Sequence, residues 1–210
     1  MAPTVALTFD DGPNPDVTPR VLELLDRHGV RATFFVWGER AQRHPELLRL
    51  IADSGHSLQP HCWEHVSHWT LGRDEIAADI DRTIALLGEI GAPAATLWRP
   101  PYGRTLRGVT ATIAAQRGLA LAGWTINPHD YAGHAAADML TGVRSQVGLT
   151  GLAVLLLHDG HREPGPLERR PDAGNTVELL RALLDEEQLS FAPLRGGLEA
   201  SLEDGPPGAV

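Results

Sequence analysis

The sequence predicts an α/β fold, a distorted (β/α)7–8 barrel built as a single domain. Short β-rich runs alternate with helix-like runs along the whole chain, which is typical of parallel βαβ units. The 210 residues, 42% of them hydrophobic, suffice for one sizeable core but not for two. About seven such units in this length favour a small barrel over the alternative, an open doubly wound sheet.

The predicted strands are short runs that are either alternating or uniformly apolar. Val5–Phe9 alternates, whereas Leu152–Leu157 is apolar throughout and is expected to be buried on both faces. The full set is Val5–Phe9, Ala32–Trp37, Ser57–Gln59, Ala95–Trp98, Leu119–Thr125, Leu152–Leu157 and Ser190–Ala192.

The predicted helices carry apolar residues at helical spacing and often end at a glycine, which readily adopts the conformation that closes a helix. They run from Asp16 to about His28, then over Pro45–Ser54, Arg73–Ile90, Leu106–Arg117, Ala135–Val147 and Asn175–Glu187. The ordered core is expected over about residues 5–193, and the Gly- and Pro-rich end, Glu203–Val210, is expected to be mobile.

Charge and composition exclude several functions. Lys and Arg total 18 against 27 Asp and Glu, and a net charge of −9 disfavours nucleic acid and anionic membranes as partners. No apolar run is long enough to span a membrane, and the single cysteine excludes an intrachain disulfide and a cysteine-only zinc site. Because the N-terminus lacks the pattern of a signal peptide, we expect a cytoplasmic protein if that terminus is native, and a secreted one if a signal was removed.

The polar residues with catalytic potential follow directly after predicted strands. In a parallel barrel the C-terminal ends of the strands converge at one mouth, so these residues are expected to meet there. They are Asp10, Asp11, His61, His65, Arg99, Asp130 and His158.

Two histidines and a carboxylate among them suggest a metal site. His61 and His65 are four residues apart, so a helical turn would place both imidazoles on one face. Asp11 would complete a two-histidine, one-carboxylate set for a divalent ion, zinc first, with Co²⁺ or Ni²⁺ as alternatives. The structural alternatives are a turn or helix cap at Asp10-Asp11-Gly12 and a chance pair among ten histidines.

Two further residues suggest acid–base chemistry. His158 emerges from an apolar strand and could act as a general acid, or it could be a hydrogen-bonded core histidine. Arg99 could orient a carboxylate through a bidentate pair, or it could be a solvated arginine.

Taken together, these segments resemble the polysaccharide deacetylases with a NodB homology domain, carbohydrate esterase family 4. The resemblance runs from about Val5 to about Pro193, and five ordered motifs make it specific. The motifs are Thr8-Phe-Asp-Asp-Gly12, His61-Cys-Trp-Glu-His65, Arg99-Pro-Pro-Tyr-Gly103, Trp124-Thr-Ile-Asn-Pro-His-Asp-Tyr131 and Leu155-Leu-Leu-His-Asp159.

The resemblance implies a NodB-type domain over residues 1–210, a distorted barrel and metal-dependent deacetylation. It implies that Asp11, His61 and His65 hold the metal. It further implies that Asp10 is the general base, positioned by Arg99, and that His158 is the general acid, paired with Asp130. The backbone N–H of Tyr102 would stabilise the oxyanion.

The chain departs from the family pattern at four positions. Cys62 stands where Ser or Thr is usual, Pro60 where Asn is usual, Asn127 where many members have Asp, and Tyr131 where many have Trp. The last two lie in the motifs that would surround the acid and the substrate cleft. They bear on substrate preference more than on catalysis.

The expected function is therefore hydrolysis of acetyl groups from N-acetylated or O-acetylated carbohydrates such as chito-oligomers, peptidoglycan or acetyl-xylan. An alternative is a cytoplasmic hydrolase acting on the carbon–nitrogen bond of a small, non-peptide amide. A non-catalytic saccharide-binding module is a third interpretation, disfavoured because Asp10 and His158 are both present. The expected partner is an acetylated saccharide or a small amide, and the sequence indicates no oligomeric state.

Overall fold

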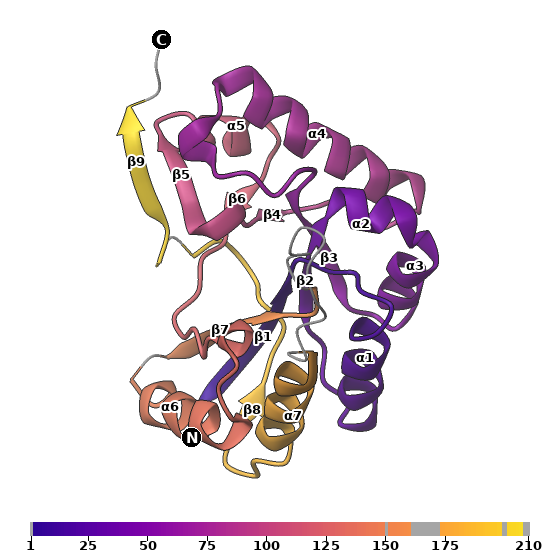
Figure 1. Ribbon diagram of the computed structural model, residues 1–210, viewed down its shortest axis with the longest axis vertical. Helices are drawn as coiled ribbons and strands as arrows, with labels where there is room; N and C mark the ends of the chain where they lie inside the picture. Colours follow the sequence, from indigo (N-terminus) through magenta and orange to yellow (C-terminus); the bar gives the residue numbers. More distant parts are fainter. Residues whose placement is uncertain (1, 150, 161–172, 199–200, 208–210) are drawn as a thin grey trace.

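A computed structural model describes residues 2–149, 151–160, 173–198 and 201–207, and its centre is a parallel sheet (Figure 1). The strands β1 (Thr4–Asp10), β2 (Thr33–Trp37), β3 (Ser57–Cys62) and β7 (Leu152–His158) follow the order β3-β2-β1-β7. The short β8 (Ser190–Phe191) pairs with the first residues of β1, on the edge that β2 uses further along. Every pairing in this sheet is parallel, as the alternation of strands and helices predicts.

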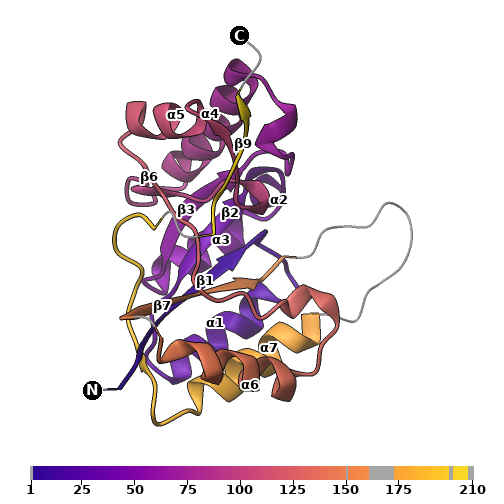
Figure 2. The ribbon, with the colours of Figure 1, turned by 90° about the vertical axis from the view of Figure 1, so that its left-hand side faces the viewer.

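Helices cover the outer face of this sheet. Figure 2 shows α1 (Thr18–Arg27), α6 (Ala136–Val147) and α7 (Ala173–Leu184) together on one side of β1 and β7, with α2 (Gly38–Arg43) and α3 (Pro45–Asp53) further along the sheet. Their apolar faces and the outward side chains of the strands form the largest buried cluster. Burial of these apolar faces is the main force that holds the helices on the sheet.

The second part of the molecule contains shorter strands and two helices. Here β4 (Leu97–Trp98) pairs with β6 (Ala120–Leu121), and β5 (Arg104–Arg107) pairs with β9 (Glu203–Pro207), both in parallel. The helices α4 (Arg73–Glu89) and α5 (Thr110–Gln116) pack around Trp98 in a separate apolar cluster.

An interior cluster joins the two parts. Side chains from β1, β2, β7 and the β4–β6 region meet on the inner side of the sheet, at Ala6, Phe35, Leu97, Ala122, Val154 and Leu194. Isolated bridges link Ile126 to Leu155 and Ala122 to Leu198, but among the described residues the sheet hydrogen bonds do not close into a continuous ring. Apolar side chains therefore fill the interior of the barrel, although the hydrogen bonds between its strands are interrupted.

Several predicted boundaries were wrong. The predicted helix over Leu106–Arg117 begins with the last residues of β5, and only Thr110–Gln116 is helical. The strand expected over Leu119–Thr125 is reduced to β6, and the strand expected at Ser57–Gln59 extends to Cys62. The expected mobile end contains β9, and residues 208–210 of it lie outside the described residues.

None of the helices in the described part of the chain is long and apolar enough to cross a membrane.

Candidate active site

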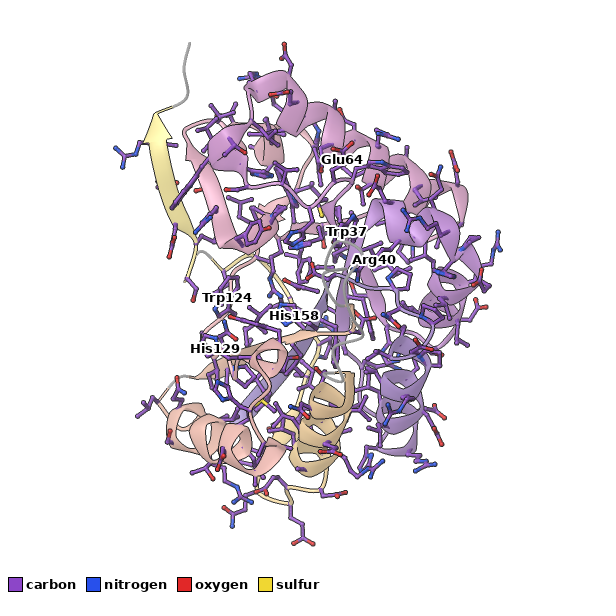
Figure 3. All side chains as sticks on the ribbon, in the orientation of Figure 1. Trp37, Arg40, Glu64, Trp124, His129 and His158 are labelled. Carbon is purple, nitrogen blue, oxygen red and sulfur yellow. The ribbon has the colours of Figure 1, made fainter. Side chains whose placement is uncertain are left out.

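The candidate residues meet at the C-terminal ends of the parallel strands. Asp10 ends β1 and lies in register with His158 at the end of β7, while His61 lies in β3. They line a cavity of about 520 Å³, together with Asp11 and His65. Figure 3 shows His158 near the middle of the molecule, between its two parts. The convergence expected from the strand ends is therefore present.

Three side chains in this cavity form a cluster with the geometry of a cation site. The Asp11 Oδ1 atom lies 3.3 Å from His61 Nε2 and 3.1 Å from His65 Nε2. One ligand atom from each of the three residues can be chosen so that all lie within 4.8 Å of one another. Asp11 adopts a positive φ of 69° directly after β1, which turns its carboxylate away from the line of the strand.

The hydrogen bonds of the cluster leave its ligand atoms available. His61 Nδ1 donates to the carbonyl oxygen of Arg99 at 2.7 Å, which leaves Nε2 as the ring nitrogen that faces Asp11 and that could bind an ion. Asp11 Oδ1 and His65 Nδ1 are buried and have no hydrogen-bond partner among the described residues. Burial alone would raise the pKa of Asp11, but the neighbouring His61 and His65 rings lower it well below its usual value. A buried, ionised carboxylate beside two imidazole nitrogens fits a divalent transition ion.

The two histidines do not lie on a helical turn, so that part of the prediction was wrong. His61 belongs to β3, and the chain then turns through Trp63 and Glu64 to bring His65 back beside it. The Asp79 carboxylate of α4 fastens this turn, because its two oxygens accept the backbone N–H groups of Trp63 at 2.7 Å and Glu64 at 2.8 Å.

The indole of Trp63 holds the same turn from the other side. It is buried against Gly38, where a Cβ atom would collide with the ring, and the guanidinium of Arg82 lies over it at 4.0 Å. Cys62 is buried as a free thiol, and it is not one of the three residues of the cluster.

Asp10 is held by a buried arginine. Arg99 Nη1 donates to Asp10 Oδ1 at 2.7 Å and to Thr8 Oγ1 at 2.8 Å. The remaining nitrogens donate to the carbonyl oxygens of Ala122 and Gly123. Arg99 is fully buried, so the alternative of a solvated arginine was wrong. Its contact with Asp10 is one N–H group rather than the expected bidentate pair, because the other donors are used by the backbone.

His158 is paired with a fully buried carboxylate. Asp130 Oδ1 lies 2.8 Å from His158 Nδ1, and Asp130 Oδ2 accepts the His158 backbone N–H and the Thr176 hydroxyl, each at 2.8 Å. Burial alone would lower the pKa of His158, but the Asp130 carboxylate raises it to about 9. The ring is therefore protonated at neutral pH, and its Nε2 side is the end left to face the cavity.

Tyr102 lines the cavity beside His65. It lies in a short 3₁₀ turn, Pro101–Gly103, with a positive φ of 61°. Its ring contacts the His65 ring with centroids 4.6 Å apart. On the other side, Tyr131 packs edge-on against His158 at 5.1 Å. The departure from the family pattern at Tyr131 therefore lies directly beside the candidate acid.

Sequence reasoning missed three residues that hold this site, namely Thr8, Asp79 and Thr176. Thr8 belongs to the first motif and could have been found there, since its side chain points to the same face as Asp10 in β1. Asp79 and Thr176 lie on helices distant in sequence from the residues they hold, and no local pattern identifies them.

These observations define a class of protein, an α/β fold with a two-histidine, one-carboxylate cluster and a paired acid and base at the mouth of its parallel strands. Residues 1–122 match the sequence profile of the family described as polysaccharide deacetylase. A chitooligosaccharide deacetylase of Bradyrhizobium is 37% identical over 184 residues, which cover 86% of this chain and 81% of the relative.

Two further relatives agree. A peptidoglycan-N-acetylglucosamine deacetylase of Bacillus cereus is 35% identical over 137 residues, 65% of this chain, and the match spans about half (49%) of that relative. The solved structure of the peptidoglycan deacetylase PdaC from Bacillus subtilis superposes with a TM-score of 0.75 at 29% identity, covering 92% of this chain and 88% of the other. The chain belongs to the polysaccharide deacetylase family and has that family's distorted (β/α) barrel.

Proposed function

We propose that the protein is a metal-dependent deacetylase that hydrolyses acetyl groups from N-acetylated carbohydrates, with O-acetylated carbohydrates as a further substrate class. One observation carries the proposal: Asp11, His61 and His65 face the same cavity as an arginine-held carboxylate and a carboxylate-held imidazolium. The relatives named above are deacetylases of chito-oligosaccharides and peptidoglycan, which supports N-acetylglucosamine units as the first substrates to test.

Asp11, His61 and His65 would hold the ion, with Zn²⁺ as the first candidate and Co²⁺ or Ni²⁺ as alternatives. When bound there, a divalent ion supplies a Lewis acid for the acetyl carbonyl and makes water more acidic. The carbonyl of Arg99 would keep His61 in the tautomer that presents Nε2 to the ion.

The chain's own residues would then move the protons. Asp10, oriented by Arg99, would accept the proton of the attacking water. The His158 imidazolium, kept charged by Asp130, would donate a proton to the leaving amine nitrogen. The backbone N–H of Tyr102 would donate to the oxyanion that forms at the acetyl carbon.

We further infer that residues 1–210 form one domain. Strand β1 supports this, because it pairs with β2 from the first third of the chain and with β7 and β8 from its last third.

The test is acetate release from N-acetylglucosamine and its oligomers, before and after chelation and after Zn²⁺ is restored. We expect release that disappears with the chelator, returns with the ion, and falls about 10²–10⁴-fold in Asp10→Asn. Asp16→Asn is the matched control, since it removes the same charge from an exposed position just before α1.

Each other outcome contradicts the proposal in a recognisable way. Binding of oligomers without acetate release from any sugar would indicate a saccharide-binding module. Hydrolysis confined to small amides would indicate the alternative enzyme class, and acetate release that survives complete metal removal would exclude the metal-dependent mechanism.

A further inference from the structure

Asp11 has a backbone conformation that few residues with a side chain adopt. Its φ of 69° lies in the left-handed region, which glycine adopts routinely and other residues only occasionally. Such a conformation persists only where surrounding contacts hold it. The carboxylate of Asp11 meets His61 and His65 from this conformation, so the contacts that hold it also bear on the geometry of the cluster.

The side chain of Arg40 makes one of these contacts. It is buried on α2, and its Nη1 atom donates to the main-chain carbonyl oxygen of Asp11 at 3.0 Å. Gly160, just after β7, lies against the same carbonyl, and a Cβ atom there would collide with the carbonyl oxygen and with Arg40 Nη1. The guanidinium therefore reaches Asp11 through a space that is open because residue 160 has no side chain.

Trp37 contacts the same turn and a second residue of the cluster. Its backbone N–H donates to the carbonyl oxygen of Gly12 at 2.9 Å, which fixes the peptide after Asp11. Its indole lies beside the His65 ring, with centroids 5.1 Å apart. The guanidinium of Arg40 lies over the indole at 4.3 Å, and Figure 3 shows both side chains near the middle of the molecule. The junction of β2 and α2 thus contacts two of the three residues of the cluster.

His65 depends on ring contacts more than His61 does. The Nδ1 atom of His61 donates to a main-chain carbonyl oxygen, whereas His65 Nδ1 is buried without a hydrogen-bond partner in the part of the chain that the structure describes. The His65 ring instead contacts the rings of Trp37 and Tyr102. Packing against these rings restricts the imidazole, which is the role that the hydrogen bond plays for His61.

The charge of Arg40 acts against its hydrogen bond. A guanidinium near a divalent cation repels it, so removing the charge alone would strengthen ion binding. Removing contacts that orient the ligands weakens ion binding, typically about 10–100-fold. We expect the second effect to dominate, because the hydrogen bond is direct and buried, while the carbonyl oxygen and the indole face partly compensate the charge.

We propose that Arg40 and Trp37 are positioning residues for the metal cluster. Arg40 holds the backbone of Asp11, and the indole of Trp37 fixes the orientation of the His65 ring. The inference rests on the proposed function, because it takes Asp11, His61 and His65 as the ligands of the ion. It deepens that function by assigning part of the affinity for the ion to a segment that supplies no ligand.

The first experiment measures Zn²⁺ affinity by calorimetry. Arg40→Met removes the charge and the donors but keeps a long side chain, whereas Arg40→Lys keeps a charge and a donor. We expect Arg40→Met and Trp37→Leu each to weaken Zn²⁺ binding about tenfold, and Arg40→Lys to weaken it less than Arg40→Met does. Arg43→Met is the matched control at an exposed position of α2 and should keep the wild-type affinity.

A second measurement separates positioning from a general loss of stability. At saturating Co²⁺ the visible absorption of the bound ion depends on the arrangement of its ligands rather than on affinity. We expect this spectrum to change in Arg40→Met and in Trp37→Leu. Val143→Ala, in the core beneath α6, lowers stability away from the cluster and should keep the wild-type affinity and spectrum.

The outcomes separate this inference from the proposed function. Zn²⁺ binding by Arg40→Met that equals or exceeds the wild type would overturn the role of Arg40 and leave the metal site intact. Wild-type affinity and spectrum in Trp37→Leu would do the same for Trp37, and this variant decides the proposal if Arg40→Met does not fold. A wild type that binds neither Zn²⁺ nor Co²⁺ would overturn the proposed metal-dependent function and this inference with it.

Discussion

The pairing of His158 with Asp130 makes a quantitative prediction for Asp130→Asn. The carboxylate is fully buried, the His158 side chain is 14% exposed, and the two groups are 2.8 Å apart. The difference between the usual histidine pKa of 6.5 and about 9 corresponds to about 3 kcal/mol in favour of the protonated ring. Removing the negative charge leaves burial as the main influence, and burial lowers the pKa.

We therefore expect the alkaline limb of the kcat profile to move down by about 1–3 pH units in this variant. The assay is acetate release across pH 6–10, together with an NMR titration of the His158 ring, which reports the pKa without depending on turnover. Asp138→Asn removes a charge from an exposed position of α6 and should leave both curves in place. An unchanged alkaline limb and an unchanged ring titration in Asp130→Asn would refute the reasoning.

The same pair links stability to pH, and the sign follows from the raised pKa. Because the folded protein binds the His158 proton more tightly than the unfolded chain, this stabilisation is fully present below pH 6.5 and is lost as the pH rises to about 9. Its upper limit is the same ~3 kcal/mol, since a bound cation nearby would oppose the protonated ring. Thermal unfolding at several pH values should show this loss in the wild type and a smaller one in Asp130→Asn.

Three further predictions concern the rest of the site. His61→Ala should lose the metal, whereas His158→Ala should retain it and lose turnover, and equal metal loss by elemental analysis would contradict the two roles. Arg99→Ala should lower the free energy of unfolding by about 3–5 kcal/mol, since it leaves the buried Asp10 carboxylate unpaired; a small change in denaturant titration would count against this. Asp79→Ala should weaken Zn²⁺ binding about tenfold, because it frees the turn between His61 and His65. Asp74→Ala is the exposed control on the same helix. Equal Zn²⁺ affinities of Asp79→Ala and the wild type in calorimetry would contradict this prediction.

The sequence predicted that Asp11, His61 and His65 lie together because they follow strand ends, and parallel strands bring those ends together whatever the local detail. It predicted the wrong local structure for His61 and His65, because a four-residue spacing is the same for a helical turn and for a strand followed by a tight loop. The loop is selected by Asp79 and by the packing of Trp63 on Gly38, which are contacts between elements. Such contacts leave no periodic pattern in the chain.

The errors at the C-terminal half have the same origin. Arg104–Arg107 is a strand only because a partner about a hundred residues later pairs with it, and the composition of that partner is typical of a mobile end. In contrast, β7 was predicted nearly to the residue, since Leu152–Leu157 is apolar on both faces and needs no distant information. Elements stabilised by their own sequence pattern could therefore be predicted, whereas elements stabilised by distant partners could not.

Arg99 serves the site through two chemically different parts of one residue. Its guanidinium donates to Asp10, while its main-chain carbonyl accepts a hydrogen bond from His61 Nδ1. Every amino acid keeps a carbonyl, so a substitution here can release Asp10 while leaving the hydrogen bond of His61 Nδ1 in place. Under the proposed function, a relative without this guanidinium would lose turnover and still bind its ion, so ion content by itself would be a poor indicator of activity.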